Sequence, residues 1–300
     1  MKIKDAMLID FAITGKCNYK CPYCDQGPFK QNNKSADDEI CDKLIDFIIN
    51  YPKTVILQLV GGEPTIHPRF MDIAKKTAES GNYLQTCTNF SNPVEFWEEL
   101  VSILKDKLCR LQVSFHPTQI KNKDEFIDKI IKFEKIKHPN TEFIVSCVLT
   151  EDNYSDIIQL REALKDTKIS FELQHERDPY GNYTKYNEKL KKLLEESPHV
   201  KGLDAISNKS SYGIKCSAGA NFITISPQGE IRRCYGEANC LYHMGNIKSK
   251  FFIYKRSIPC MCKHCTCNLP FTHGCLNFNK KMYFLQIYST YLLSLGARKP

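Results

Sequence analysis

Three cysteines near the start of the chain, Cys17, Cys21 and Cys24, share one short segment with the spacing C-x3-C-x2-C. Three thiolates on one loop can each bind one iron of a [4Fe–4S] cubane, whereas closed cluster sites and structural zinc sites normally take four ligands. No fourth cysteine or histidine lies nearby in the sequence. The spacing therefore favours a cluster with one open iron, which suits a catalytic role better than a structural role.

A second candidate segment is Val60-Gly61-Gly62-Glu63-Pro64, which follows an apolar run. A glycine pair lets the backbone approach a ligand without obstruction by a Cβ atom. The Glu63 carboxylate beside it can accept hydrogen bonds from an ammonium group. Taken alone, the segment is also typical of an ordinary turn, so its meaning depends on where it lies relative to the cysteines.

The elements that position both segments alternate in type. Through residues 1–200, short β-rich apolar runs alternate with polar segments of helical spacing, which predicts parallel strands joined by right-handed crossovers. Six such units are too few for an eightfold barrel, so we expect a curved, partly open α/β barrel with its site at the C-terminal ends of the strands. The expected strands are 7–13, 54–60, 83–88, 109–115, 143–150 and 169–174, and the expected helices are 37–50, 67–80, 93–105, 123–137, 154–165 and 186–196.

The cysteine segment, with Tyr23 before its last cysteine and a position after the first expected strand, resembles the radical S-adenosylmethionine superfamily. The order of elements is similar to that superfamily's partial (β/α)6 barrel. Gly61-Gly62-Glu63-Pro64 agrees, because the superfamily binds the amino group of the cofactor's methionine moiety after strand two. The resemblance implies a [4Fe–4S] cluster on the three cysteines, chelated at its open iron by S-adenosylmethionine. It also implies reductive cleavage of that cofactor to a 5′-deoxyadenosyl radical, which abstracts a substrate hydrogen atom.

The resemblance also points to weaker candidates near the ends of later strands. His116 stands where many relatives carry aspartate, and it either faces the substrate or is a hydrogen-bonded turn histidine. The others are expected to contact cofactor or substrate, although strand capping or a solvated loop explains each equally well. They are Thr88, Asn89, Ser114, Gln174 and Arg177.

The chain of 300 residues carries fifteen cysteines, eight of them between Cys216 and Cys275. A secreted disulfide scaffold would be shorter and would spread its cysteines, so this clustering indicates metal ligation. Cys216, Gly229 and Cys234 follow the order C-x12-G-x4-C, with Gly229 in an expected hairpin turn. This order resembles the opening of SPASM and twitch domains, which carry auxiliary Fe–S clusters.

The SPASM pattern is incomplete after that opening. Phe271 occupies a cysteine position, and no cysteine follows Cys275. The resemblance implies one auxiliary cluster, and two auxiliary clusters remain an alternative. Zinc is a third alternative, because it accepts the same C-x2-C spacing. The other cysteines leave open a second cluster, a zinc site or a hydrogen-donating catalytic thiol, with Cys240 and Cys267 as candidates for the last. The expected ligands of the auxiliary cluster are Cys216, Cys234, Cys262 and Cys265, and the possible second site comprises Cys240, Cys260, Cys267 and Cys275.

Composition excludes several other classes of protein. A hydrophobic share of 42% and a charged share of 25% exclude a disordered or collagenous chain. No apolar run approaches the roughly 20 residues that span a bilayer, and Asp5 and Asp10 interrupt any signal peptide. We therefore expect a cytoplasmic protein. Residues 201–280 carry eleven Lys or Arg against three Asp or Glu. This excess of positive charge either offsets the negative charge of metal-bound thiolates or attracts an acidic partner.

These observations predict three segments: a barrel at 1–200, a cysteine-rich auxiliary-cluster domain at 201–280 and an amphipathic helix or tail at 281–300. The expected substrate is a peptide or a small polar molecule, including a sugar or nucleotide-linked one, that undergoes oxidation, cross-linking or epimerisation. The resemblance implies a reducing partner such as flavodoxin or ferredoxin, and nucleic acid is not an expected partner. The rival function is a non-catalytic zinc-binding module that contacts nucleic acid or protein. Such a module does not need a three-cysteine loop that leaves one iron open. The metal that the protein binds, iron or zinc, distinguishes the two functions.

Overall fold

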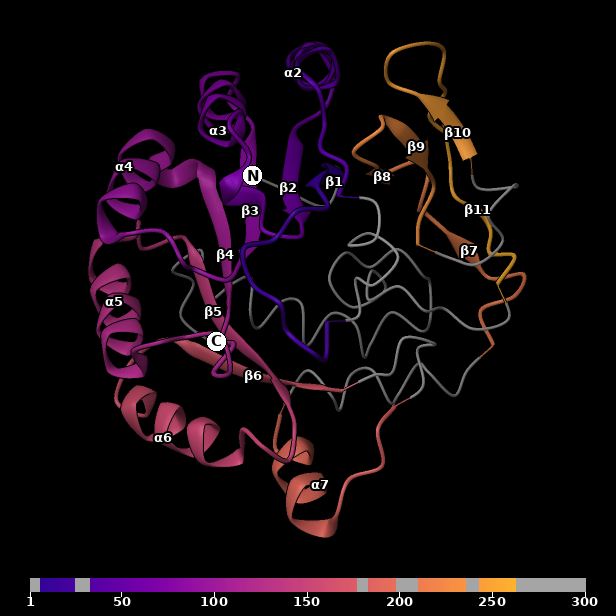
Figure 1. The fold of residues 1–300 in the computed structure, drawn as a ribbon. Helices are drawn as coiled ribbons and strands as arrows, with labels where there is room; N and C mark the ends of the chain where they lie inside the picture. Colours follow the sequence, from indigo (N-terminus) through magenta and orange to yellow (C-terminus); the bar gives the residue numbers. More distant parts are fainter. Residues whose placement is uncertain (1–5, 25–32, 177–182, 198–209, 236–242, 263–300) are drawn as a thin grey trace, which may run out of the picture.

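The structure of this chain is a computed structural model, and it describes residues 6–24, 33–176, 183–197, 210–235 and 243–262. Strands and helices alternate through the first two thirds, as the hydrophobic pattern predicts (Figure 1). The strands are β1 (Met7–Thr14), β2 (Val55–Gly61), β3 (Tyr83–Thr88), β4 (Leu108–Ser114), β5 (Glu142–Leu149), β6 (Ser170–His175), β7 (Lys215–Cys216), β8 (Phe222–Ile225), β9 (Glu230–Arg232), β10 (His243–Asn246) and β11 (Ile258–Pro259). The helices are α2 (Asp38–Asn50), α3 (Phe70–Glu79), α4 (Val94–Leu104), α5 (Lys123–Ile136), α6 (Tyr154–Leu164) and α7 (Glu188–Glu195), with short 3-10 turns η2 (Pro64–Ile66) and η3 (Lys105–Lys107).

The six strands β1 to β6 pair in parallel and in sequence order, which confirms the predicted partial barrel. Within the part of the chain that the structure describes, nine strands follow the linear order β10-β9-β8-β1-β2-β3-β4-β5-β6, and no pairing between β6 and β10 closes the sheet. Parallel order places the C-terminal ends of β1 to β6 along one rim, where the loops that follow them meet.

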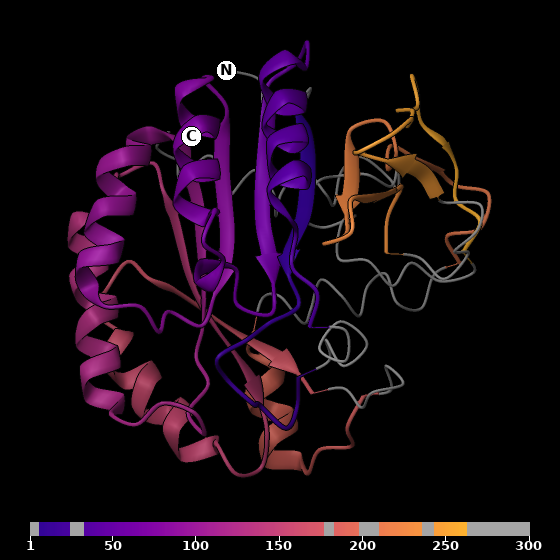
Figure 2. The same cartoon turned by 45° about the horizontal axis from the view of Figure 1, so that its top comes forward.

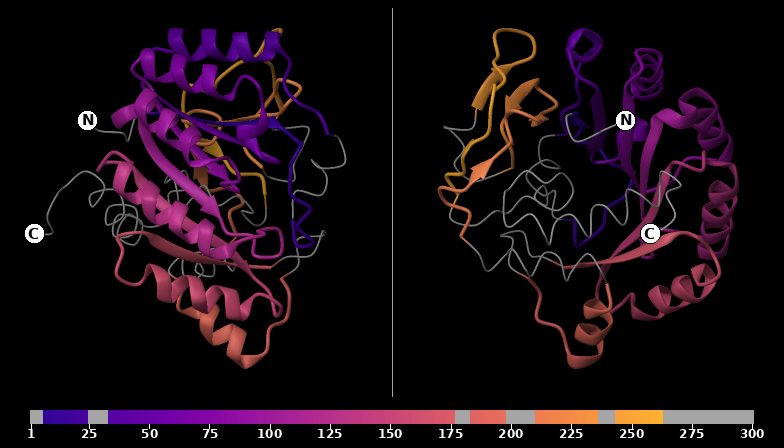
Figure 3. Two further views of the ribbon diagram at one scale, coloured as in Figure 1. Left: turned by 60° about the vertical axis from the view of Figure 1, so that its left-hand side comes forward. Right: turned by 180° about the vertical axis from the view of Figure 1, so that it is seen from behind.

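The helices cover the convex face of the sheet, because each presents an apolar stripe to it (Figures 2 and 3). In α5 the buried stripe is formed by Phe126, Ile127, Ile130 and Phe133. Each such side chain contributes roughly 1.5–3 kcal/mol through burial. In α4, Trp97 is fully buried and its ring stacks on Phe90, with centroids 4.3 Å apart.

Local signals explain where the helices begin and end. Asp37 caps α2 by accepting from Ile40 N at 2.9 Å, and Gly81, with φ +81°, follows the end of α3. The helix predicted from residue 67 begins only at Phe70. Residues 64–66 form η2 instead, and the imidazole of His67 is bound outside the helix, 3.0 Å from Ala36 O.

The sheet continues across the predicted segment boundary at residues 200 and 201. β8 pairs in parallel with β1, and β9 and β10 then add antiparallel strands beyond it. β8 and β9 form the predicted hairpin, with Gly229 at φ +77° in its turn. The expected C-terminal helix lies outside the described residues. Among the residues that are described, no helix is long and apolar enough to cross a membrane.

Candidate functional site

The segment that carries the first three cysteines, called the cysteine loop below, leaves the C-terminal end of β1, and its described ends, residues 15–24 and 33–35, are joined at the base. Gly15 N donates to Lys34 O at 2.7 Å, and the hydroxyl oxygens of Thr14 and Ser35 are 2.6 Å apart. These contacts hold the two ends of the loop side by side. The cysteines therefore extend from an anchored base at the rim of the barrel.

Gly61 and Gly62 allow this loop to pass directly over the end of β2. Gly62 N donates to Thr14 O at 2.7 Å, and Glu63 N donates to Lys16 O at 2.8 Å. A Cβ atom on Gly61 would lie 2.1 Å from Thr14 O, and one on Gly62 would lie 2.1 Å from Lys16 O. Any side chain here would displace the cysteine loop, so the chain's own backbone requires the glycine pair, apart from any ligand.

The Glu63 carboxylate is buried, and it fastens the end of β2 to the end of β3. Its Oε1 accepts from Thr65 N at 3.1 Å, from Thr65 Oγ1 at 2.6 Å and from Thr88 Oγ1 at 2.8 Å, while Oε2 accepts from Asn89 N at 2.6 Å. Burial raises the pKa of Glu63, and these hydrogen bonds oppose that rise by favouring the charged form. Three predicted residues, Glu63, Thr88 and Asn89, thus form one buried unit, and Pro64 begins η2 directly after it.

Asn89 connects that buried unit to the cysteine loop. Its Nδ2 donates to Asn18 Oδ1 at 2.7 Å and lies 3.9 Å from Cys17 Sγ, while Tyr19 N donates to the same sulfur at 3.4 Å. Donors at a sulfur stabilise a thiolate, which is the form that binds metal. Across the described ranges, no three Cys, His, Asp or Glu side chains already converge at metal-binding spacing. The donor set nevertheless fits a cluster with one open iron: three thiols on an anchored loop.

Tyr23, which lies in the cysteine loop, contacts His116, which follows β4. Tyr23 Oη lies 3.1 Å from His116 Nδ1, and their rings stack with centroids 5.9 Å apart. Tyr19 meets the imidazole edge-on at 5.9 Å, and Lys20 N donates to Gln119 Oε1 at 3.0 Å. Burial raises the pKa of Tyr23, which keeps its phenol protonated. The segment after β4 therefore supports the cysteine loop through hydrogen bonds, and a role for His116 toward substrate stays a prediction.

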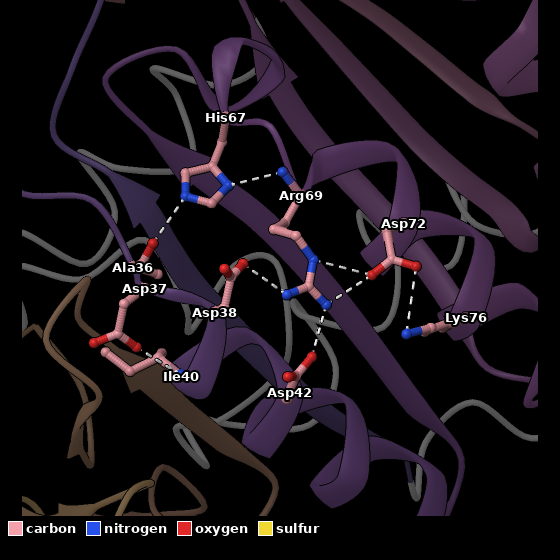
Figure 4. Close-up of polar contacts among 9 residues, drawn as sticks. All are labelled: Ala36, Asp37, Asp38, Ile40, Asp42, His67, Arg69, Asp72 and Lys76. Atoms are coloured by element: carbon pink, nitrogen blue, oxygen red, sulfur yellow. Dashed lines mark hydrogen bonds and ion pairs between the residues drawn. The ribbon is translucent and has the colours of Figure 1, made fainter.

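A charged cluster around Arg69 fastens the start of α2 to the start of α3 (Figure 4). The Arg69 side chain is only 20% exposed, and His67 beside it accepts from Arg69 N at 3.2 Å. Because α2 follows the cysteine loop and α3 follows Glu63, the cluster braces both segments from outside. The guanidinium pairs with three carboxylates, which are Asp38 at 2.9 Å, Asp42 at 2.7 Å and Asp72 at 2.8 Å.

A row of polar side chains crosses the concave face of the sheet, which is the face opposite the helices. These residues alternate along each strand with the apolar residues that pack under the helices. Parallel register places Asp10, Gln58 and Gln85 side by side on β1, β2 and β3. Gln58 Nε2 donates to Asp10 Oδ2 at 3.1 Å, and Gln85 Nε2 donates to Gln58 Oε1. The register continues the row to Arg110, which is paired with Glu142 at 2.5 Å. This row places hydrogen-bonding groups on the concave face of the sheet.

Asp10 is the residue of this row that links the barrel to the C-terminal strands. Its side chain is buried, and it lies beside Tyr235, which follows β9. Burial raises the pKa of Asp10 to about 7, while the hydrogen bond from Tyr235 lowers it. The carboxyl therefore changes charge near neutral pH. The hydrophobic pattern did not select it, although a lone charge at an inward position of an apolar strand is a usable signal.

The remaining predicted barrel residues lie further around the rim. Ser114 ends β4 opposite Ser146 of β5, and Gln174 lies near the end of β6 opposite Val148. Arg177 lies outside the described residues. Sequence reasoning missed Asn18, which lies in the cysteine loop and accepts from Asn89, and Gln119, which accepts from Lys20 N; both contacts exist only because the fold brings distant segments together.

The C-terminal cysteines that are described gather in one place. Cys216 and Cys260 are buried in a small cluster with apolar residues of β1, β2 and β8, and Cys234 and Cys262 pack against it. Cys260, which the sequence pattern placed in a separate second site, therefore lies with the first set. The other predicted ligands in this part of the chain, Cys240, Cys265, Cys267 and Cys275, lie outside the described residues.

The scattered cysteines of the barrel have a different character. Burial raises the pKa of Cys41 to about 11 and the pKa values of Cys87 and Cys109 to about 12. Burial also raises the pKa of Cys147. Thiols in this range stay protonated at neutral pH, so these four act as small apolar side chains.

Comparison with known proteins gives a family and a fold. Residues 11–164 match the family described as the Radical SAM superfamily. The chain is 27% identical to the tungsten-containing aldehyde ferredoxin oxidoreductase cofactor-modifying protein of Pyrococcus furiosus, over 51% of this chain and 46% of that protein. It is also 27% identical to a putative glycyl-radical enzyme activating enzyme of Methanocaldococcus jannaschii, over 68% of this chain and 79% of that protein.

A solved structure shows the same fold. Streptococcus suis SuiB, crystallised with its precursor peptide SuiA, matches with a TM-score of 0.58 at 16% identity, over 83% of this chain and 64% of that one. The chain thus spans less than half of the Pyrococcus protein and about two thirds of SuiB.

Proposed function

This chain belongs to the Radical SAM superfamily, and from that premise we propose that it is an enzyme that cleaves S-adenosylmethionine and removes a hydrogen atom from a polar substrate. Family membership implies a [4Fe–4S] cluster and S-adenosylmethionine. In this proposal Cys17, Cys21 and Cys24 hold the cluster and leave one iron open. When bound, the cluster and the cofactor supply one electron and a 5′-deoxyadenosyl radical.

The observation that carries the proposal is the contact between the cysteine loop and the glycine pair. Gly62 N and Glu63 N hold the loop backbone, and the absent side chains at Gly61 and Gly62 leave it room to pass. The same unit brings Asn89 to Cys17 Sγ. A non-catalytic zinc module gives no reason for a three-cysteine loop built so tightly onto the rim of a barrel.

The proposed roles of the rim residues follow from their places. Glu63 and Thr88 hold the rim together, and Asn89 is proposed to contact the cofactor beside Cys17. The contact of His116 with Tyr23 supports the loop from the β4 side. Contacts from positions further around the rim to the cofactor or the substrate are proposed for Ser114, Gln174 and Arg177.

The substrate is proposed to be a peptide or a small polar molecule that enters the concave face. A partly buried row of carboxyl, amide and guanidinium groups would discriminate between substrates by hydrogen bonding, because a substrate that leaves these groups without partners pays the cost of their desolvation. SuiB is a fold neighbour solved with a peptide, whereas the Pyrococcus relative is named for modifying a cofactor. Both substrate classes therefore stay in the proposal.

The C-terminal cysteines are proposed to hold an auxiliary cluster, with zinc as the alternative metal. Four of them lie in or against one buried cluster that borders β1 and β2. An auxiliary cluster there would accept one electron from a substrate radical during oxidation of the substrate. A flavodoxin- or ferredoxin-like protein is the proposed donor of the first electron.

The proposal is tested by reductant-dependent formation of 5′-deoxyadenosine from S-adenosylmethionine in the anaerobically reconstituted protein. Cys24→Ala should lower the rate by more than about 100-fold, because the cluster loses one of three ligands. Cys41→Ala, at a buried thiol of α2, is the matched control and should leave the rate within about twofold. Full activity in Cys24→Ala, or protein that holds zinc and no iron, would overturn the proposal.

The substrate class is tested with fractions from cells grown in deuterated medium. Hydrogen abstraction from a labelled substrate should place deuterium in the 5′-deoxyadenosine that forms. Label that follows the peptide fraction supports a peptide, and label that follows the low-molecular-weight fraction supports a small polar molecule. Label from neither fraction, with cleavage proceeding, would overturn both substrate classes.

A further inference from the structure

We propose that Arg233 joins Cys216, Cys234 and Cys260 into a single metal–thiolate site that also includes Cys262. The inference rests on the proposed metal-binding role of the C-terminal cysteines and assigns their ligands. It differs from the sequence pattern, which groups Cys260 with a second site.

The pairing of β7 with β11 brings Cys216 and Cys260 to one face. Cys216 lies opposite Ile258 in the antiparallel register, and Cys260 N donates to Ile214 O at 2.8 Å. Because side chains alternate along a strand, residues two positions apart share a face, and cross-strand partners share it too. Both thiols are buried in the same apolar cluster, at 6% and 8% exposure.

Ser211 sets the path of the chain from Cys260 to Cys262. Its hydroxyl donates to Cys262 O at 2.8 Å and lies 3.7 Å from Cys260 Sγ. Ser211 is fully buried, and Cys262 packs against the same cluster as Cys260. The two cysteines of this segment therefore contact the same apolar cluster.

Arg233 ties these segments together. Its side chain is 1% exposed, and its guanidinium donates to four carbonyl oxygens. Since Cys234 is the next residue, one side chain connects the segments of three cysteines. The acceptors are Ala218 O at 2.7 Å, Pro259 O at 2.9 Å, Ile258 O at 2.8 Å and Cys216 O at 3.2 Å.

The charge of Arg233 also suits this role. Four thiolates around a [4Fe–4S] core in its 2+ state, or around Zn²⁺, carry a net charge of 2−. The carbonyl dipoles satisfy the N–H groups of Arg233, and its buried positive charge additionally favours such an anionic centre. Arg233 is thus a positioning residue that also tunes the site, whichever of the two metals binds. Metal binding would complete the convergence of the sulfurs, as is usual where binding and local folding are coupled.

The ligand assignment is tested in a triple variant, Cys17→Ala, Cys21→Ala and Cys24→Ala, which lacks the ligands of the first cluster. Iron, sulfide and zinc per chain are measured after anaerobic reconstitution. Adding Cys260→Ala should remove one site, about four irons or about one zinc. Cys147→Ala, at a buried barrel thiol, is the control and should change nothing. Unchanged metal in the Cys260→Ala variant overturns the assignment. A triple variant without metal overturns it also, while 5′-deoxyadenosine formation by the wild-type protein tests the radical function separately.

The role of Arg233 is tested with Arg233→Gln and Arg233→Lys. For an iron site, Arg233→Gln should shift the reduction potential to more negative values in an EPR-monitored titration, and Arg233→Lys should restore it. For a zinc site, Arg233→Gln should weaken affinity by about 10- to 100-fold. If Arg233→Gln does not fold, Arg233→Lys should still lower metal occupancy, because an ammonium cannot reach four carbonyls. Wild-type potential or affinity in Arg233→Gln, or wild-type occupancy in Arg233→Lys, would contradict the proposed role.

Discussion

The two cysteine-bearing regions of this molecule are anchored by buried side chains of opposite charge. At the rim of the barrel, the Glu63 carboxylate accepts hydrogen bonds from the ends of two strands and holds the segment over which the cysteine loop passes. In the C-terminal region, the Arg233 guanidinium donates to four carbonyl oxygens and holds the segments that carry Cys216 and Cys260.

This difference shows how each region suits the group that it is proposed to bind. A buried carboxylate near the first loop suits a cofactor that carries a sulfonium and an ammonium group. A buried guanidinium beside four cysteines suits a site whose ligands are all thiolates. In both regions, the charged side chain acts through the backbone that it fastens, so its loss is expected to affect metal binding without removing a ligand.

The largest effect is expected from Gly62→Ala. The new Cβ atom would lie 2.1 Å from Lys16 O and 2.8 Å from Gly15 O, so the cysteine loop must move. Iron bound by the first loop should fall by more than half, while metal at the C-terminal cysteines stays. Gly81→Ala is the control, because its Cβ meets nothing within 4 Å and only its φ of +81° resists the change. Equal loss of metal from both regions would mean that the two regions do not bind metal independently of each other.

The next largest effect is expected from Glu63→Gln. The amide turns one acceptor oxygen into an NH2 donor, so at least one of the buried donors that face Glu63, such as Asn89 N, loses its acceptor. Unfolding in denaturant should show a loss of about 1–3 kcal/mol, the cost of one buried donor without an acceptor, together with weaker binding of S-adenosylmethionine. Glu79→Gln, at an exposed position of α3, is the control and should cost less than about 0.5 kcal/mol. If Glu63→Gln leaves both stability and cofactor affinity unchanged, the buried carboxylate is not the anchor of this region.

The sequence predicted the barrel well because its signals are local. Alternating apolar runs and helical stripes gave all six parallel strands of the barrel to within one or two residues, and the Pro227-Gln228-Gly229 turn gave the hairpin. The helix expected from residue 67 began late, since its first residues are held by contacts with Ala36 and η2 that a window of sequence does not contain.

The sequence could not show how the candidate residues act on one another. The family resemblance singled out Glu63, Thr88 and Asn89 separately, and only the parallel register of β2 and β3 joins them. Arg233 carried no sign of its role, because its four acceptors are backbone oxygens from segments up to 26 residues away. Motifs record which groups are present, whereas partners depend on tertiary contacts.

An effect of opposite sign, which depends on pH, is expected from Asp10→Asn at the junction of the two regions. The folded carboxyl has a pKa of about 7 and the reference value is 3.8, so the folded state holds the proton more tightly between those limits. Stability should therefore fall as pH rises from about 4 to 7, by up to roughly 4 kcal/mol. Asp10→Asn removes that fall and should raise the melting temperature more at pH 8 than at pH 5. Asp46→Asn, at an exposed position of α2, should leave the pH profile intact, and an unchanged profile in Asp10→Asn would contradict the prediction.

The smallest effect is expected from Arg69→Lys on the outer surface of the first region. The three carboxylates around Arg69 are 37% to 82% exposed, so water and salt screen them, and a network of this kind contributes about 1 kcal/mol. The loss should shrink further at high salt, and Lys75→Ala, which breaks one exposed pair, should be near neutral. Iron in the cysteine loop should be retained in Arg69→Lys, because the buried contacts of Glu63 remain. Loss of that iron would show that surface charge, and not the buried carboxylate, anchors the first region, and the contrast with Arg233 would no longer hold.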